Sequence, residues 1–198
     1  MIEFIEEGHI YLMDGVIIPS VSEILHFIFP NKYAGIDKEI LNKKAEYGSK
    51  IHEAIECIEQ GKILPELDSI QEFSISQYKR LKEKYNIEVI DQEQMINFKD
   101  KYCGRFDMIA NVNGFYSLCD IKTTATLDKE YLSWQLSFYE LAFISMYGVS
   151  NFDKLYAIWL PKKGYGEVVE IERKSKSKLL DKLKEFEKYR KVNNGEIN

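Results

Sequence analysis

GRFDMIANVNGFYSLCDIKT, which spans residues 104–123, predicts two β-strands joined by a tight turn. Both halves are rich in β-branched and aromatic residues, and Asn113-Gly114 between them is a strong short signal for a hairpin. Because side chains alternate along a strand, we expect Asp120 and Lys122 on one face and Ile121 on the other. One face of the second strand therefore carries a carboxylate beside an ammonium.

The charged side chains of this hairpin suit metal-assisted hydrolysis. If Asp107 lies on the face of Asp120, two carboxylates and the Lys122 ammonium converge at one end of the hairpin. Carboxylates are preferred ligands of Mg²⁺ and Mn²⁺, and a neighbouring lysine can position or deprotonate water or neutralise charge on a phosphate. Asp-x-Lys alone is a common surface pair. Apolar neighbours instead predict an inner strand, where unpaired acids are costly: Phe106, Met108, Leu118, Cys119 and Ile121.

The rest of the chain predicts helices on both sides of the central strands. Ser20 and Glu23 form a capping-box pattern, and Gly61 and Gly148 are typical of helix ends. In order, we expect hairpin strands 2–5, 9–13 and 16–18, helices 20–29, 37–60 and 70–85, antiparallel strands 87–98, 102–112 and 115–123, a helix 129–147, strands 154–160 and 166–171, and a helix 175–191. This order predicts an α/β fold in which helices flank a mixed sheet.

Length and composition favour one domain over residues 1–198. Within it we distinguish an N-terminal hairpin and short helix (1–30), a core (37–148) and C-terminal strands with a Lys-rich helix (149–198). The N-terminus is acidic where a secretory signal is basic, and no segment has the roughly 18 apolar residues of a membrane span, so we expect a cytoplasmic protein. The net charge of −5 argues only mildly against a nucleic-acid partner, because a metal-binding nuclease site is itself acidic.

The three cysteines predict no disulfide framework and no metal centre of their own. Cys57, Cys103 and Cys119 are scattered and form no CxxC pair, so neither a zinc ribbon nor a four-cysteine iron–sulfur cluster can be built within one chain. We expect reduced thiols that pack as small core residues.

Four motifs in order resemble the PD-(D/E)XK nuclease superfamily in its RecB-like branch. Gly104-x-x-Asp107 and Asp120-x-Lys122-Thr123 resemble its catalytic core. Upstream, residues 48–52 (GSKIH) resemble the helical motif whose histidine joins the metal site. Downstream, residues 135–139 (QLSFY) resemble a Gln-x-x-x-Tyr motif, in which residues four apart share one helical face. The resemblance implies the PD-(D/E)XK, restriction-endonuclease-like, core fold.

The same resemblance implies roles for individual residues. Asp107 and Asp120 would bind Mg²⁺ or Mn²⁺ with His52 and the Ile121 carbonyl, and Lys122 would serve the attacking water. Gln135 and Tyr139 would position the DNA strand beside the metal. The implied activity is a DNA phosphodiesterase, an exonuclease that needs a single- or double-stranded end, in phage or bacterial recombination and repair.

The resemblance extends to the N-terminus. His9-x-Tyr11, Asp14-Gly15 and residues 19–25 (PSVSEIL) are similar to phage exonucleases of the superfamily and to the mitochondrial genome-maintenance exonuclease. This region lies near the nucleic-acid path in those relatives, which makes Ser20 and Ser22 candidate phosphate contacts, although helix capping already explains Ser20.

Two departures from the family pattern limit what it implies. Phe106 replaces the proline that gives the superfamily its name. The cluster-binding cysteines of some relatives are missing, so we expect no iron–sulfur cluster. The chain has no Walker loop, so a helicase partner would be another chain, and a dimer or ring around DNA would explain how an acidic protomer stays bound.

Several alternatives stay open at the level of sequence. The chain could be an endonuclease, a catalytically silent nucleic-acid-binding module with the same fold, or a plain interaction protein. Glu93 could add a carboxylate to the site or be an exposed strand acid, and Glu56 could orient His52. We expect the Lys-rich helix to be amphipathic, buried through Leu179, Leu183 and Phe186.

Overall fold

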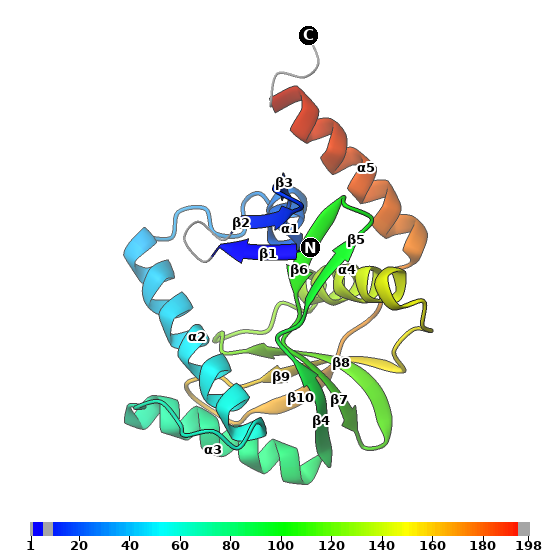
Figure 1. The fold of residues 1–198 in the computed structure, drawn as a ribbon. Coiled ribbons are helices and arrows are strands. Elements are labelled where there is room, and N and C mark those ends of the chain that lie inside the picture. The colour runs from blue at the N-terminus through cyan, green and yellow to red at the C-terminus, as the bar shows by residue number, and fades with distance from the viewer. Residues whose placement is uncertain (1, 6–9, 194–198) are drawn as a thin grey trace.

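The computed structural model describes residues 2–5 and 10–193 and has a mixed α/β architecture (Figure 1). Its elements follow the predicted order closely. They are β1 (Ile2–Ile5), β2 (Ile10–Met13), β3 (Val16–Ile18), α1 (Val21–Ile28), α2 (Lys38–Glu59), α3 (Ser69–Lys84), β4 (Ile87–Gln92), β5 (Met95–Phe98), β6 (Tyr102–Arg105), β7 (Met108–Val112), β8 (Phe115–Lys122), α4 (Lys129–Tyr147), β9 (Lys154–Trp159), β10 (Glu167–Glu170) and α5 (Lys176–Asn193).

A five-stranded mixed sheet forms the centre of the molecule, in the order β10-β9-β8-β7-β4. β7 and β8 make the predicted hairpin, with Met108 opposite Cys119 and Val112 opposite Phe115. β8 and β9 run parallel, because α4 carries the chain back across the sheet between them. The sheet is therefore mixed and lies between helices, as the sequence predicts.

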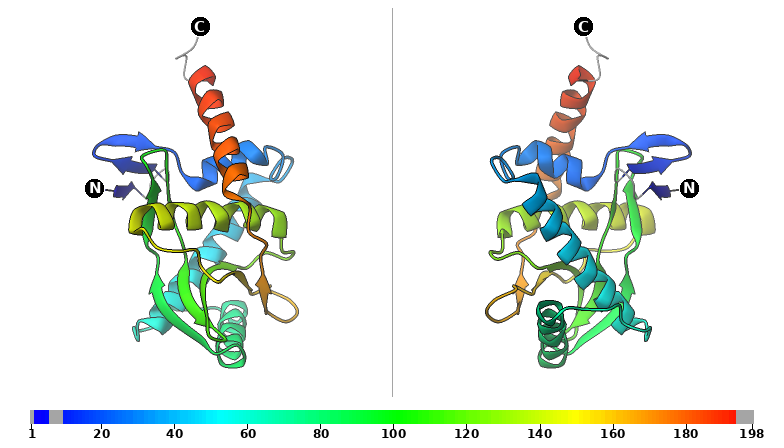
Figure 2. Two further views of the ribbon diagram at one scale, coloured as in Figure 1. Left: turned by 90° about the vertical axis from the view of Figure 1, so that its right-hand side faces the viewer. Right: turned by 90° about the vertical axis from the view of Figure 1, so that its left-hand side faces the viewer.

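Each face of this sheet has its own layer of helices (Figure 2). Ile109 and Leu118 point to one face and pack into a core with residues of α1, α4 and α5. Cys119 and Ile121 point to the other face and pack into a second core with residues of α2 and α3. The period-two alternation predicted for β8 is thus confirmed by the two separate cores.

Two of the three predicted central strands are not continuous, so the prediction of unbroken strands 87–98 and 102–112 is wrong. Glu93 has a positive φ of 52° and ends β4, and Phe106 separates β6 from β7. β5 and β6 then pair as a separate two-stranded sheet. A left-handed conformation is costly for a residue with a side chain, and such strain often lies at functional positions.

Helix ends follow the capping patterns in the sequence. Ser20 and Glu23 form the predicted capping box of α1, and Gly148 ends α4 in the left-handed conformation. A second capping box, between Asp68 and Gln71, begins α3. Because such side chains satisfy the free amides of a first turn, local sequence fixes where these helices begin.

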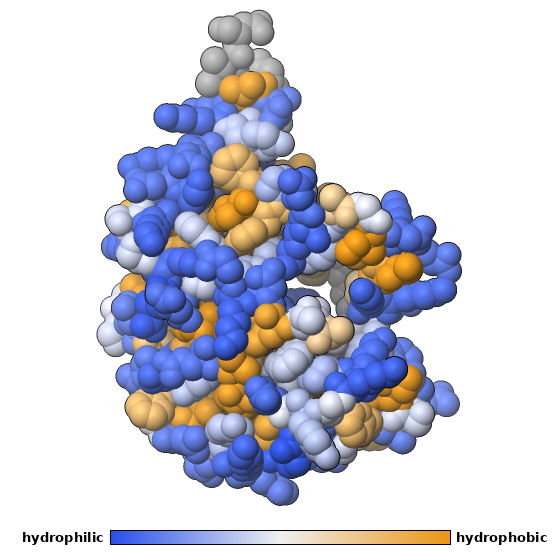
Figure 3. Space-filling model, turned by 180° about the vertical axis from the view of Figure 1, so that it is seen from behind, coloured by the Kyte–Doolittle hydropathy of each residue, from blue (hydrophilic) through white to orange (hydrophobic). Residues whose placement is uncertain are grey.

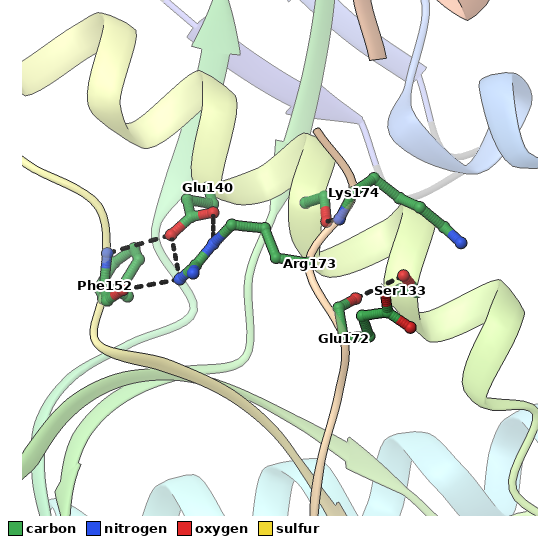
Figure 4. Close-up of polar contacts among 7 residues, drawn as sticks. Ser133, Glu140, Phe152, Glu172, Arg173 and Lys174 are labelled. Carbon is green, nitrogen blue, oxygen red and sulfur yellow. Dashed lines mark hydrogen bonds and ion pairs between the residues drawn. The ribbon is translucent and has the colours of Figure 1, made fainter. Parts of the chain in front are cut away.

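Partly buried polar contacts join the segment before α5 to α4 and to the segment that follows α4 (Figure 4). Arg173 donates from Nε to Glu140 Oε2 at 2.6 Å and from Nη2 to the Phe152 carbonyl at 2.6 Å, and Ser133 donates to the Glu172 carbonyl at 2.5 Å. α5 then packs through Leu179, Leu183 and Phe186, as predicted.

The outer surface is mixed in character. Seen from behind, hydrophilic side chains cover much of the face, and apolar groups gather in its lower half (Figure 3).

Cys103 and Cys119 are buried thiols and Cys57 is partly buried. No helix in the ranges 2–5 and 10–193 combines the length and apolarity needed to cross a bilayer.

Candidate functional site

A cavity of about 720 Å³ opens where β6 and β8 end, between the N-terminal hairpin, α2 and α4. Most of the predicted site residues line it: Ser20, Ser22, His52, Asp107, Lys122, Gln135 and Tyr139. These residues come from widely separated segments of the chain. Folding therefore brings the separate sequence motifs to one place.

His52 on α2 contacts Asp107, which lies between β6 and β7, and Ile121 on β8. Its Nε2 lies 3.1 Å from the Ile121 carbonyl oxygen, and its Nδ1 lies 3.6 Å from Asp107 Oδ1. The other Asp107 oxygen, Oδ2, accepts a hydrogen bond of 2.7 Å from the Ile121 amide. His52, Asp107 and Ile121 thus form one connected group, and the main chain of β8 holds the Asp107 carboxylate.

Asp120 is buried beside Lys122 on the face of β8 that α4 covers. The residue is 1% exposed, and its Oδ2 lies 2.5 Å from Lys122 Nζ. Apart from that ammonium, no hydrogen-bond donor among the described residues reaches either Asp120 oxygen. Burial raises the pKa of Asp120 above its ordinary value, although Lys122 acts in the opposite direction. Burial disfavours the Lys122 charge, but the Asp120 and Asp107 carboxylates outweigh it and raise the lysine pKa.

Glu93 belongs to the site, which the sequence left open. It stands with His52 and Asp107 in a group whose ligand atoms all lie within 4.8 Å of one another. Burial, and after it the Asp107 charge, raises the pKa of Glu93 to about 7. Its Oε2 also lies 2.9 Å from Arg105 Nε. Glu93 was expected within an unbroken strand, whereas β4 ends at Gln92 just before it.

Gln135 and Tyr139 face each other along α4, as their spacing predicts. Gln135 Nε2 donates to the Tyr139 hydroxyl at 3.3 Å, while Gln135 Oε1 is buried without a partner among the described residues. Burial raises the pKa of Tyr139 well above its ordinary value, so the phenol stays neutral and keeps its proton. The pair therefore offers hydrogen-bonding groups to the cavity.

Gly104 leaves room for the Tyr139 ring. A Cβ built on residue 104 would stand 2.6 Å from Tyr139 Cε1 and 3.2 Å from Val21 Cγ2. The glycine of the Gly-x-x-Asp motif thus has a packing reason in this fold. Gly48 differs, since a Cβ there would meet only Thr123 Oγ1 at an ordinary 3.5 Å.

The serines and Glu56 lie on the cavity wall with separate functions. Ser20 is buried and accepts the Glu23 amide at 3.1 Å, so its side chain already caps α1. Ser22 lines the cavity, and no described contact engages its side chain. Glu56 also lines the cavity and accepts a hydrogen bond from Gln60, while the two ring nitrogens of His52 face the Ile121 carbonyl and Asp107.

The donor set fits a hard divalent cation. Carboxylates from Glu93, Asp107 and Asp120, an imidazole and the Ile121 carbonyl are the ligand types that Mg²⁺ and Mn²⁺ accept. Ligand atoms of His52, Glu93 and Asp107 lie within 4.8 Å of one another, so one ion could contact all three. Asp120 is the strongest sign, because its buried oxygens have no partner among the described residues except the Lys122 ammonium.

Comparisons with known proteins add little to this picture. No protein-family model matches the chain, and no curated protein is significantly similar to it. A solved structure, that of a protein named SSO0001, is 20% identical over 84% of this chain and 72% of its own, with a TM-score of 0.42. A likeness of this size assigns no activity to this chain.

Proposed function

We propose that this chain is a metal-dependent deoxyribonuclease of the PD-(D/E)XK superfamily, RecB-like branch, which digests DNA from its ends. One observation carries the proposal. Asp120 is 1% exposed, and apart from the Lys122 ammonium, which lines the same cavity as Asp107, no hydrogen-bond donor among the described residues reaches its oxygens. Since leaving a buried carboxylate poorly paired costs stability, a ligand that satisfies it is the simplest reason to keep it.

The cation would be held by Asp107 and Asp120 with His52 and the Ile121 carbonyl, and Glu93 is close enough to join them. When bound, Mg²⁺ or Mn²⁺ would polarise the phosphate and favour ionisation of an attacking water. Because these acids repel a DNA strand, a bound ion would also strengthen the binding of the substrate.

The chain's own side chains supply charge and orientation. The Asp120 and Asp107 carboxylates raise the pKa of Lys122 in the metal-free protein. In the proposed reaction the lysine would serve the attacking water or neutralise negative charge on the phosphate. Tyr139 and Gln135 provide a hydroxyl and an amide on one face of α4, where they would hold the strand. His52 keeps the Asp107 carboxylate and the Ile121 carbonyl at fixed positions.

Digestion of end-labelled linear DNA tests the proposal. Single-stranded, double-stranded and closed circular substrates are incubated with Mn²⁺, Mg²⁺ or EDTA. We expect metal-dependent loss of linear DNA, no loss of circles, and at least a hundredfold slower digestion by Lys122→Gln and Asp120→Asn. Lys154→Gln is the matched control, because Lys154 also pairs with a carboxylate, Glu170 at 2.6 Å, but stands outside the cavity.

Each other outcome has a definite meaning. Cutting of circles would make the enzyme an endonuclease. DNA binding without digestion by either metal would favour a silent binding module with the same fold. Equal digestion by the parent, Lys122→Gln and Asp120→Asn would overturn the proposed site.

A further inference from the structure

Arg105 and Glu93 form an ion pair at the edge of the cavity. Arg105 is the last residue of β6, and Glu93 follows the end of β4. Arg105 Nε lies 2.9 Å from Glu93 Oε2, and the two side chains are 42% and 22% exposed. This pair therefore stands in solvent on one side and against the acidic site on the other, because Glu93 is also within 4.8 Å of the His52 and Asp107 ligand atoms.

The charges of the cavity wall make Arg105 important for an anionic substrate. Among the described residues the wall carries four carboxylates, from Glu53, Glu56, Glu93 and Asp107. The lysine and arginine cations on the same wall are Lys122 and Arg105. Lys122 is 23% exposed and bound to buried Asp120, so Arg105 is the more accessible of the two.

An aromatic ring holds the Arg105 side chain independently of Glu93. The guanidinium carbon lies 5.2 Å from the centroid of the Phe4 ring, a cation–π distance. Phe4 in turn packs on Tyr11, with 4.8 Å between the ring centroids. The guanidinium would therefore keep its position if Glu93 moved away, and its planar set of donors matches two oxygens of a phosphate.

We propose that Arg105 binds a phosphate of the DNA strand, and that Glu93 occupies Arg105 until that phosphate displaces it. The inference rests on the proposed nuclease function and assigns a binding function to Arg105, which occupies an unspecified position of the Gly104-x-x-Asp107 motif. The displaced Glu93 carboxylate remains beside His52 and Asp107, where it can join the cation. Substrate binding and completion of the acidic site are then coupled through one ion pair.

The two members of the pair should have opposite effects on DNA binding. In a purely structural ion pair, removing either partner breaks the same contact. If Glu93 instead competes with phosphate, Glu93→Gln frees Arg105 and tightens binding, whereas Arg105→Gln weakens it. Loss of an acid also reduces general repulsion of DNA, so the double variant is needed to isolate the coupling between the residues.

The experiment measures the dissociation constant of fluorescent single-stranded oligonucleotides in EDTA at low salt. Oligonucleotides with a 5′-phosphate and with a 5′-hydroxyl distinguish a terminal phosphate from one within the strand. We expect roughly tenfold weaker binding by Arg105→Gln, severalfold tighter binding by Glu93→Gln, and little gain from Glu93→Gln when Arg105 is already glutamine. Preference for the 5′-phosphate that disappears in Arg105→Gln would identify the terminal phosphate; equal losses would identify an internal one.

Lys101→Gln and Glu187→Gln provide the matched control. This pair lies 2.6 Å apart with side chains 43% and 35% exposed, similar to Arg105 and Glu93, but outside the cavity. Neither control should change binding by more than about twofold. The inference is wrong if Arg105→Gln and Glu93→Gln shift the constant in the same direction, if Glu93→Gln helps equally in both backgrounds, or if the parent does not bind.

Digestion kinetics with Mn²⁺ separate this inference from the proposed function. Arg105→Gln should raise KM about tenfold and change kcat much less, as expected for a residue that binds substrate. Metal-dependent digestion by the parent with an unchanged KM in Arg105→Gln would leave the nuclease standing and reject the phosphate-binding function. Absence of any digestion would reject the nuclease itself.

Discussion

The backbone of Gly104 lies against the ring of Tyr139, so closely that a Cβ at residue 104 would stand 2.6 Å from Tyr139 Cε1. The Gly-x-x-Asp motif on β6 and the Gln-x-x-x-Tyr motif on α4 therefore touch each other. The contact is possible only because residue 104 is glycine and has no side chain. Since Tyr139 also accepts a hydrogen bond from Gln135, the position of this one ring affects both the core and the cavity.

Gly104→Ala should destabilise the protein by about 1–3 kcal/mol, because the added methyl group forces the buried ring to move. Chemical denaturation measures the change. Gly48→Ala is the control, since its Cβ would make only an ordinary contact in the middle of α2, and it should stabilise by about 0.5–1 kcal/mol. Equal effects of the two substitutions would contradict the importance of the Tyr139 contact.

The acidic site should make the metal-free protein less stable at higher pH. Burial raises the pKa of Glu93 to about 7, above its ordinary value, so the folded state binds more protons than the unfolded state between about pH 4.5 and 7. Stability is therefore lost as pH rises through this range. Glu93→Gln has no carboxyl group to ionise at this position and should not lose stability in this way.

Denaturation in EDTA at several pH values checks this effect. We expect the free energy of unfolding to fall between pH 5 and 8 by about 1–2 kcal/mol less in Glu93→Gln than in the parent, a figure that allows for solvent screening. Glu39→Gln, on the exposed start of α2, should follow the parent at every pH. Parallel curves for Glu93→Gln and the parent would show that the Glu93 carboxylate carries no penalty in the folded protein.

Mn²⁺ should stabilise the protein through the same acids. A cation present at a hundred times its Kd adds about 2.7 kcal/mol to the free energy of unfolding, which raises Tm by several degrees. Asp107→Asn and His52→Gln should lose most of this shift in a thermal melt, whereas Asp181→Asn on α5 should keep it. A parent Tm that does not respond to Mn²⁺ would favour the silent binding module.

Substitutions of Ser20 and Ser22 should have different effects on stability and on DNA binding. Ser20→Ala removes the α1 cap and should cost about 1 kcal/mol of stability, whereas Ser22→Ala should cost little. If Ser22 contacts a phosphate, its removal weakens oligonucleotide binding without changing the denaturation midpoint. A loss of stability in Ser22→Ala as large as that in Ser20→Ala would show that the two serines are not separable.

Most of the architecture could be predicted from the sequence, because the local sequence signals agree with the packing of the whole fold. Asn113-Gly114, the Ser20 capping box and Gly148 each mark a boundary that the fold keeps. The alternation along β8 put Asp120 and Lys122 on one face, and the two hydrophobic cores confirm that assignment. Signals of this kind depend only on neighbouring residues.

The break between β4 and β5 could not be predicted in the same way. Residues 87–98 have a continuous strand-like composition, and the left-handed backbone at Glu93 is imposed by contacts with the segment around Asp107. Glu93 was consequently left open between a site residue and an exposed strand acid, and Arg105 was given no function. A glutamate at a positive φ position has no distinctive sequence pattern, so its place in the cavity emerges only from the tertiary fold.

The Asp107 carboxylate is held by a main-chain group, the Ile121 amide, which donates to Oδ2 at 2.7 Å. The NMR signal of that amide therefore reports on the Asp107 carboxylate. Any ion or substrate that draws electron density from Asp107 must alter this bond, so the Ile121 nitrogen and proton resonances should respond even when no side chain is labelled. The occupancy of the site can then be followed from one backbone signal, in the intact protein and without measuring turnover.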